Sequence, residues 1–140
     1  MLFPKKELDF STPKVMGVIN LTTDSFFDGG KFLRKDNSFD ESKILNSIES
    51  MIDDGADFID IGAQSTKPGF TKISSSEELD RLGFIFDKLN DYPVLFSIDT
   101  FNYEVIKEAI NKKIDLINNV FSFSDQESFK LVSRNDIPIC

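Results

Sequence analysis

Apolar residues along the chain cluster into four short runs, and each run ends in residues that form hydrogen bonds. The runs are rich in Val, Ile and Phe and mostly do not alternate with polar residues, which is typical of strands buried on both faces of a parallel sheet. We therefore predict four parallel strands with polar side chains at their carboxyl ends. The runs and the residues that close them are 15–19 before Asn20, 58–62 before Gln64, Ser65 and Thr66, 94–98 before Asp99, and 116–117 before Asn118 and Asn119.

Between the runs, apolar residues recur at the spacing of helices that bury one face. The first helical segment follows Ser38 and Glu41, which are spaced as a capping box, and the second opens at Ser75 with Glu78 in the matching position. Two shorter helical segments follow, and residues 137–140 are expected to begin a fifth strand. The apolar positions of the four helices are Ile44, Leu45, Ile48, Met51 and Ile52; Leu79, Leu82, Phe86 and Leu89; Val105, Ile106, Ala109 and Ile110; and Phe129, Leu131 and Val132.

Strands that alternate with helices fit either a doubly wound open sheet or part of a (β/α)8 barrel. A Rossmann-type sheet is expected to carry a Gly-x-Gly-x-x-Gly turn after its first strand, and no such turn follows Asn20. A complete barrel takes roughly 250 residues, so four and a half βα units make up about half of one. We predict an α/β fold, the amino-terminal half of a (β/α)8 TIM barrel, with residues 1–140 as one partial barrel domain.

Composition narrows the chemistry that is available to this chain. A net charge of −8 argues against a nucleic-acid partner, and the absence of histidine excludes Ser-His-Asp and Cys-His catalytic sites. With no histidine and one cysteine, Cys140, zinc sites are excluded too, so a bound metal is expected to be oxygen-ligated Mg²⁺. No stretch approaches the ~20 apolar residues that span a bilayer. The lone cysteine fits a reducing compartment, and we predict a cytoplasmic protein without a membrane partner.

The ends of the first, third and fourth runs carry candidate chemistry. Asn20 offers an amide oxygen to Mg²⁺ or an NH₂ group to a phosphate. The Asp24 and Asp28 carboxylates, which could help to hold the metal, follow in a segment that also suits an ordinary polar βα loop. Asp99 can accept two parallel hydrogen bonds from a planar amino-imine edge, such as that of a pterin, or it can cap the following helix. Asn118 both donates and accepts, which suits the mixed edge of a heterocycle, or it serves as a turn residue.

The second run and the segment after it add further candidates. Asp60 lies inside the apolar run, where a carboxylate is expected either to accept structural hydrogen bonds or to face the site. Beyond the run, Thr66 supplies a hydroxyl and Lys67 a cation for an anionic group. Pro68 and Gly69 form a turn sequence that is common in any protein.

These motifs resemble those of the dihydropteroate synthases. The run from Met16 to Gly30 is similar to the amino-terminal signature of that family, and residues 65–69 are similar to its second signature. Ser97-Ile98-Asp99-Thr100, with Ile117-Asn118, resembles its pterin-binding strand ends. The resemblance implies a (β/α)8 barrel that joins a dihydropterin methyl pyrophosphate to p-aminobenzoate, with release of pyrophosphate, in folate synthesis.

The resemblance also implies roles for individual residues. Asp99 and Asn118 would be catalytic, and both would bind the pterin together with Thr66. Asn20 and Asp28 would hold the Mg²⁺ ion that accompanies the pyrophosphate. The other substrate-binding residues that the resemblance implies, mainly around p-aminobenzoate, are Ser25, Phe26, Lys67 and Pro68.

The chain departs from the usual residues of that family at four positions. It has Thr23 in place of Pro, Gln64 in place of Glu, Lys67 in place of Arg and Asn119 in place of Asp. Lysine lacks the two-pronged hydrogen bonding of arginine, which changes the contacts available to an anion. The family also takes an Asp, a Lys and an Arg of its site from the second half of the barrel.

Two other functions stay open at this point. One is a non-catalytic, truncated barrel fragment that binds ligand weakly. Such a fragment would associate, as a homodimer or with a complementary half, through the strand edges that barrel closure removes. The other is a pterin-binding methyltransferase domain, which shares the barrel but is disfavoured by the Asp24-Ser25-Phe26 loop.

Overall fold

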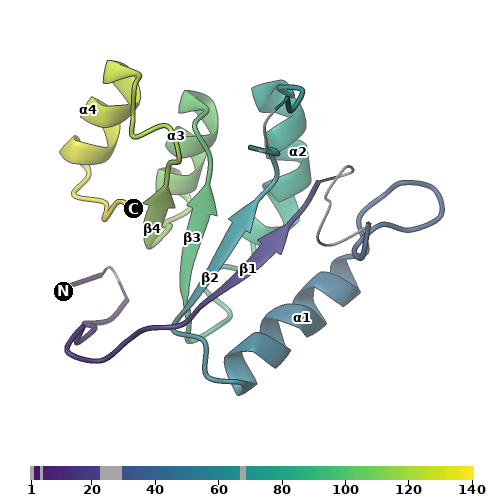
Figure 1. Cartoon of the computed structure of the whole chain (residues 1–140), viewed down its shortest axis with the longest axis horizontal. Helices are drawn as coiled ribbons and strands as arrows, with labels where there is room; N and C mark the ends of the chain where they lie inside the picture. The colour runs from purple at the N-terminus through teal and green to yellow at the C-terminus, as the bar shows by residue number, and fades with distance from the viewer. Residues whose placement is uncertain (1, 4, 23–29, 67–68) are drawn as a thin grey trace.

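The computed structural model describes residues 2–3, 5–22, 30–66 and 69–140. Four strands alternate with four helices along the chain (Figure 1). The strands pair in parallel in the order β1-β2-β3-β4. The elements are β1 (Met16–Asn20), α1 (Glu41–Asp53), β2 (Phe58–Gly62), α2 (Ser75–Phe86), β3 (Leu95–Asp99), α3 (Tyr103–Asn111), β4 (Leu116–Asn118) and α4 (Gln126–Arg134).

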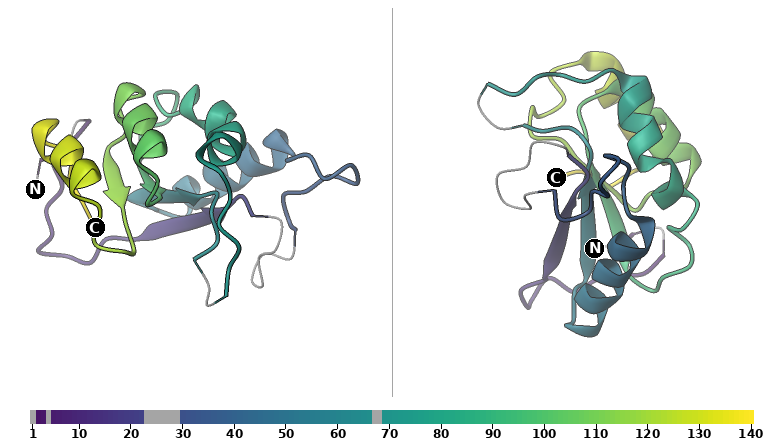
Figure 2. Two further views of the ribbon diagram at one scale, coloured as in Figure 1. Left: turned by 90° about the horizontal axis from the view of Figure 1, so that it is seen from above. Right: turned by 90° about the vertical axis from the view of Figure 1, so that its right-hand side faces the viewer.

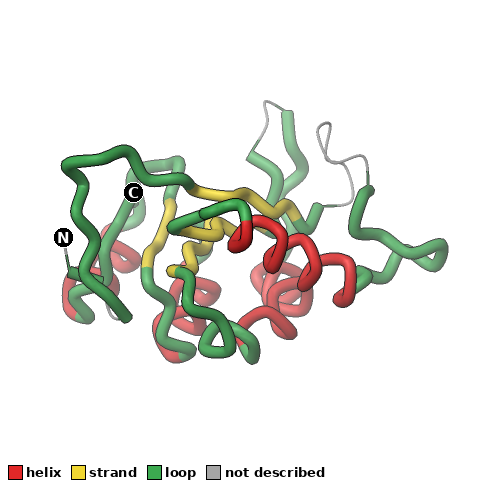
Figure 3. Tube along the Cα trace, turned by 90° about the horizontal axis from the view of Figure 1, so that it is seen from below, coloured by secondary structure: helices red, strands yellow, loops and turns green. Residues whose placement is uncertain are grey.

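All four helices lie on one face of the sheet (Figures 2 and 3). Alternate strand residues such as Ile19, Ile61 and Ile98 point toward the helices and are fully buried there. A doubly wound sheet would carry helices on both faces, whereas a barrel keeps them all outside. The arrangement is therefore that of a partial (β/α) barrel, as the sequence predicts.

The opposite face of the sheet is covered at its amino end by residues that precede β1. Phe3 and Leu8 pack there against Phe58 and Leu95. One row farther along β1, Val18 is 50% exposed. This face is thus apolar and closed near the start of the strands and more open toward their carboxyl ends.

Gly17 allows α1 to pack close against β1. A Cβ atom at this position would lie 2.6 Å from the Met51 sulfur and 3.2 Å from Ile59 Cδ1, closer than side chains can approach without a shift. α1, with 13 residues, is the longest helix in the described part of the chain. None of the described helices is long and apolar enough to cross a membrane.

The helix caps differ from the predicted capping boxes. α1 is capped by Asp40 rather than Ser38, and the Ser38 hydroxyl donates instead to Asp36 (2.7 Å) in the preceding turn. α2 is capped by Ser74, one residue before the predicted Ser75. Neighbouring Ser and Asp residues are equally good caps, so the contacts of the preceding turn decide which one is used.

The predicted fifth strand begins as expected. Ile139 forms a parallel bridge with Ile117 of β4. The Ile117 amide donates to the Pro138 carbonyl, and the Cys140 amide donates to the Ile117 carbonyl, each at 3.0 Å. The parallel order therefore continues past α4.

Candidate active site

Three predicted site residues lie in one row across the carboxyl ends of the strands. Asn20 of β1 is in register with Gly62 of β2, and Gly62 is in register with Asp99 of β3. Asp99 is in turn in register with Asn118 of β4. The residue before each of them faces the helices, so the row faces the other side, which is the interior of a barrel. The strand ends thus bring Asn20, Asp99 and Asn118 together.

Gly62 leaves a space between two of these polar side chains. A Cβ atom on Gly62 would lie 3.5 Å from Asn20 Oδ1 and 3.5 Å from Asp99 Cβ. It would also lie 3.6 Å from Asp99 Oδ2. The two side chains therefore flank the glycine, and the absence of a side chain at this position keeps the space between them open.

A second carboxylate lies one row below. Asp60 is in register with Ser97, two residues before Asp99, and is only 4% exposed. Asp60 Oδ2 accepts a hydrogen bond from Asn118 Nδ2 at 3.1 Å. The expectation that Asp60 accepts a structural hydrogen bond is thus confirmed. The contact holds the Asn118 side chain on the sheet, which ends the alternative interpretation of Asn118 as a turn residue.

The surroundings of Asp99 disfavour its negative charge. Burial raises the pKa of the Asp99 carboxyl to about 7, and the nearby carboxylates of Asp60 and Glu78 add to the rise. Asp99 Oδ1 is buried and has no hydrogen-bond partner among the described residues. The N-cap of α3 is Asn102, so Asp99 does not serve as the helix cap. A ligand that brings N–H donors or positive charge would stabilise the ionised carboxylate.

Glu78 is a site neighbour that the sequence indicates only as a capping-box residue. It is fully buried and accepts a hydrogen bond from Asn102 Nδ2, while the Asn102 amide donates to Thr100 Oγ1 at 3.2 Å. Burial raises the pKa of Glu78, and hydrogen bonds from Thr100 and Asn102 oppose the rise. Glu78 shares one helix face with the buried Leu82 and Ile85, and this spacing is the signal that could have located it.

Gln64 organises the loop that follows β2. Its Nε2 donates to the carbonyl oxygens of Ser65 (2.8 Å) and Thr71 (3.3 Å), and its Oε1 accepts from the Ile73 amide (2.8 Å). The predicted pterin contact Thr66 lies exposed in this loop, at the same end of the sheet as the row but outside it. Gln64 therefore uses both ends of its amide to close the loop that carries Thr66.

The remaining predicted site residues lie outside the described part of the chain. They are Ser25, Phe26, Asp28, Lys67 and Pro68.

The described residues contain no group of three or more Cys, Asp or Glu side chains arranged to hold a metal ion. Asn20 supplies an oxygen donor at the strand end. Magnesium commonly binds one or two protein oxygens together with water and substrate phosphates. Asn20 thus supplies one oxygen of the kind that magnesium binds.

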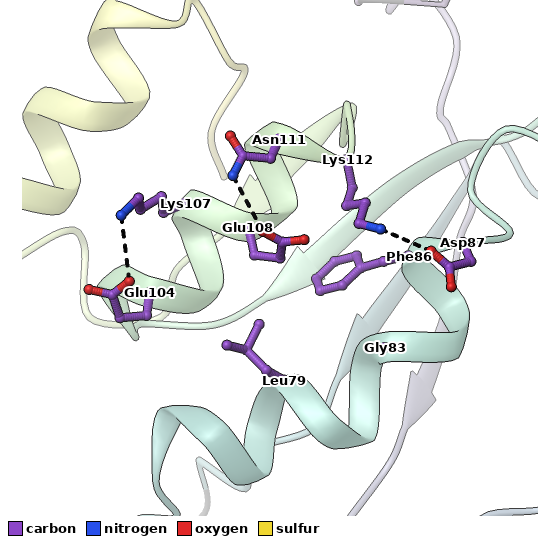
Figure 4. Close-up of a pocket in the computed structure, with 9 residues that line it drawn as sticks. All are labelled: Leu79, Gly83, Phe86, Asp87, Glu104, Lys107, Glu108, Asn111 and Lys112. Carbon is purple, nitrogen blue, oxygen red and sulfur yellow. Dashed lines mark hydrogen bonds and ion pairs between the residues drawn. The ribbon is translucent and has the colours of Figure 1, made fainter.

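A separate groove lies between α2 and α3 on the helix side of the sheet (Figure 4). It has a volume of about 640 Å³ and is lined by apolar and charged residues from both helices. Four of its charged side chains form two ion pairs, with Lys112 Nζ 2.9 Å from Asp87 Oδ1 and Lys107 Nζ 3.9 Å from Glu104 Oε2. The fifth, Glu108, accepts a hydrogen bond from Asn111 Nδ2 at 3.3 Å. The groove therefore lies on the opposite face from the strand-end row and presents no uncompensated charge from these two pairs.

Comparison with known proteins identifies the family. The sequence profile described as "pterin binding enzyme" matches residues 16–140. The chain belongs to this family of pterin-binding enzymes. Among individual relatives, a mitochondrial folate synthesis bifunctional protein of Arabidopsis thaliana is 45% identical over 136 residues. That alignment covers 93% of the chain and 24% of the relative.

Solved structures agree with the family assignment. The dihydropteroate synthase of Yersinia pestis, solved with a sulfonamide drug, matches the whole chain at 33% identity with a TM-score of 0.87. The dihydropteroate synthase of Burkholderia cenocepacia, solved with 7,8-dihydropteroate, matches 99% of the chain at 30% identity with a TM-score of 0.80. The chain spans 49% and 44% of these two proteins, so it corresponds to just under half of each.

Proposed function

We propose that this chain carries the pterin-binding and magnesium-binding part of a dihydropteroate synthase. The enzyme would join a dihydropterin methyl pyrophosphate to p-aminobenzoate and release pyrophosphate. The observation that carries the proposal is the half-buried Asp99 carboxyl, which lies in register between Gly62 and Asn118 and whose buried Oδ1 has no hydrogen-bond partner among the described residues. Membership of a family of pterin-binding enzymes supports the same ligand.

Asp99 and Asn118 would bind the pterin ring. The ring presents a guanidine-like edge with parallel N–H donors, which matches a carboxylate acceptor, and the Asn118 amide matches the mixed donor and acceptor edge. In the reaction, the bond between the methylene carbon and the pyrophosphate oxygen breaks, and pyrophosphate leaves with the electron pair. The amine nitrogen of p-aminobenzoate then forms a bond to that carbon and releases a proton. Asp99, whose ionised form a bound pterin would stabilise, would in turn stabilise the cationic pterin between these steps.

Asn20 would hold Mg²⁺, with Asp28 as the second ligand implied by the family resemblance. Magnesium, when bound, neutralises charge on the pyrophosphate group as it leaves. Asn20 flanks Gly62 on the side opposite Asp99, so the metal would lie beside the pterin. Thr66, Ser25, Phe26, Lys67 and Pro68 would complete the substrate contacts from the two loops.

A titration of the 140-residue chain with a dihydropterin alcohol tests the pterin site. Asp99→Asn should weaken binding at least about tenfold, because a neutral amide replaces a charge-assisted acceptor. The matched control is Asp91→Asn, the same change at a side chain that is 56% exposed and paired with Lys88 on the surface. Binding that is unaffected by Asp99→Asn would contradict the proposal.

The same titration addresses the alternative of a fragment that only associates through the strand edges that barrel closure removes. That alternative is supported by Val15 and Val18 of the β1 region, which are 58% and 50% exposed. An associating fragment without a pterin site would show no binding that depends on Asp99. Such a result would favour self-association, as a homodimer or with a complementary half, over the synthase function.

A further inference from the structure

The guanidinium group of Arg81 links the residues that follow the carboxyl ends of β1 and β2. The side chain of Arg81, on α2, is 13% exposed. Its Nη1 donates to the carbonyl oxygens of Leu21 (3.3 Å) and Ala63 (3.0 Å). Its Nη2 donates to Glu77 Oε1 at 2.6 Å, one turn earlier on the same helix. One side chain thus joins α2 to two neighbouring strands.

The two carbonyl groups directly follow the row of site residues. Leu21 comes after Asn20, and Ala63 comes after Gly62. The Leu21 amide donates to the Gly62 carbonyl at 2.7 Å, and both strands end at this level. Arg81 therefore bridges the segments that follow β1 and β2, at the point where the strand pairing no longer fixes the distance between them.

The chemistry of arginine suits this bridge. Its planar guanidinium presents donors in a fixed fork, so it can serve two carbonyl acceptors and one ion pair at once, whereas lysine is a single point charge. Packing of α2 does not need a cation here, because Leu82, Ile85 and Phe86 already bury the helix face. Removing a cation from water costs free energy that an apolar residue would not. The contacts of Arg81 thus indicate a role beyond holding the helix.

We infer that Arg81 is a positioning residue of the proposed site. By bridging the carboxyl ends of β1 and β2, it keeps Asn20 aligned with Asp99 on the two sides of Gly62. The consequence for ligands rests on the proposed function, in which Asn20 holds the metal and Asp99 holds the pterin. The bridge itself can be tested without any ligand.

The first test is amide hydrogen exchange, measured by NMR on the 140-residue chain. Arg81→Met should speed exchange of the Leu21 amide at least about tenfold, because hydrogen bonds from a charged donor are lost beside it. Exchange at Ile59, in the middle of β2, should stay the same. The matched control is Arg34→Met, the same change at a side chain that is 52% exposed and 3.7 Å from Asp40.

Arg81→Lys provides a second variant that keeps the positive charge. It should give an intermediate increase in exchange, because an ammonium group can reach one carbonyl but cannot reproduce the fork. Exchange at Leu21 that is unchanged in both variants would overturn the inference. Exchange in the lysine variant equal to that of the unmodified chain would also overturn it, because the fork would then be unnecessary.

The second test separates positioning from a general structural role. Calorimetric titration compares the dihydropterin methyl pyrophosphate, in the presence of Mg²⁺, with the dihydropterin alcohol that lacks pyrophosphate. Arg81→Met should weaken binding of the pyrophosphate ester about tenfold or more and leave binding of the alcohol within about twofold, since Asn20 serves only the former. An equal loss of binding affinity for both ligands would overturn the inference.

The two proposals fail in different ways. If the unmodified chain binds neither ligand, the proposed function is contradicted, and Arg81 is judged on hydrogen exchange alone. If the unmodified chain binds both ligands and Arg81→Met changes neither affinity, the proposed function stands and the positioning role of Arg81 is overturned.

Discussion

At the scale of single residues, Asp99 shows how neighbours set the chemistry of a side chain. Its place at a strand end can be predicted from the apolar run before it, because a run of buried residues defines the strand and its parallel partners. Its charge state cannot be predicted in this way, because the pKa depends on burial in the folded chain and on Asp60 from β2 and Glu78 from α2, which are distant in sequence. The result is a carboxyl group with a pKa of about 7 facing the open part of the sheet.

This pKa predicts a pH dependence of stability. Burial and the two neighbouring carboxylates raise the pKa of Asp99 from 3.8 to about 7, so between these values the folded chain keeps a proton that the unfolded chain has lost. The stability contributed by Asp99 is therefore complete below the lower value and is lost as the pH rises through the higher one. Asp99→Asn cannot ionise, so its stability relative to the unmodified chain should increase between about pH 5 and about pH 8.

Urea unfolding of the two proteins at both pH values measures this difference. Asp115 also has a pKa raised by burial, but its contribution is the same in both proteins. Glu78 interacts with Asp99, so the comparison measures the titration of Asp99 together with its effect on Glu78. Asp91→Asn, at an exposed position, should follow the unmodified chain at both pH values. If the difference in stability between Asp99→Asn and the unmodified chain is the same at both pH values, Asp99 does not titrate in this range.

At the scale of elements, the loop after β2 depends on one side chain. Gln64 donates to Ser65 and Thr71 and accepts from Ile73, so its amide group matches both carbonyls and an N–H group. A glutamate, the usual residue in dihydropteroate synthases, could still accept from Ile73 but would face the two carbonyl oxygens with negative charge. The contacts at Gln64 are therefore specific to an amide.

We predict that Gln64→Glu lowers the free energy of unfolding by about 1–3 kcal/mol, the cost of buried hydrogen-bonding groups left without partners. Urea unfolding near neutral pH measures the change. The matched control is Gln126→Glu at the exposed start of α4, where an acidic residue is compatible with the helix dipole and should have little effect. Equal stability of Gln64→Glu and the unmodified chain would mean that the loop rearranges to accept a carboxylate.

The order and type of the elements follow from the sequence, but the helix caps and the contacts between elements do not. Apolar spacing predicts the strands and helices because each element must bury one face or both. The caps at Asp40 and Ser74 differ from the predicted ones because several nearby residues can cap a helix and the preceding turn selects among them. Arg81 and Glu78 are harder to predict, because spacing places a long side chain on a helix face without fixing what its end contacts.

At the scale of the whole molecule, the row of site residues exists only because four βα units place their strands in one register. Asn20, Asp99 and Asn118 are separated by up to about 100 residues and meet because parallel strands end at the same edge. The inner face beside the row is open at Val18, which is half exposed. The chain therefore presents the row on an accessible surface, in a molecule that spans just under half of the solved synthases it matches.

The central claim, that this row is a pterin site, is tested most directly by NMR. Spectra of the labelled 140-residue chain would be recorded while a dihydropterin alcohol is added. We predict that the largest shifts occur at the Asp99 backbone amide and the Asn118 side-chain amide, with no comparable change at Gly83 or Lys112 in the groove between α2 and α3 (Figure 4). Shifts centred on that groove, or no shifts at the strand ends, would contradict the claim.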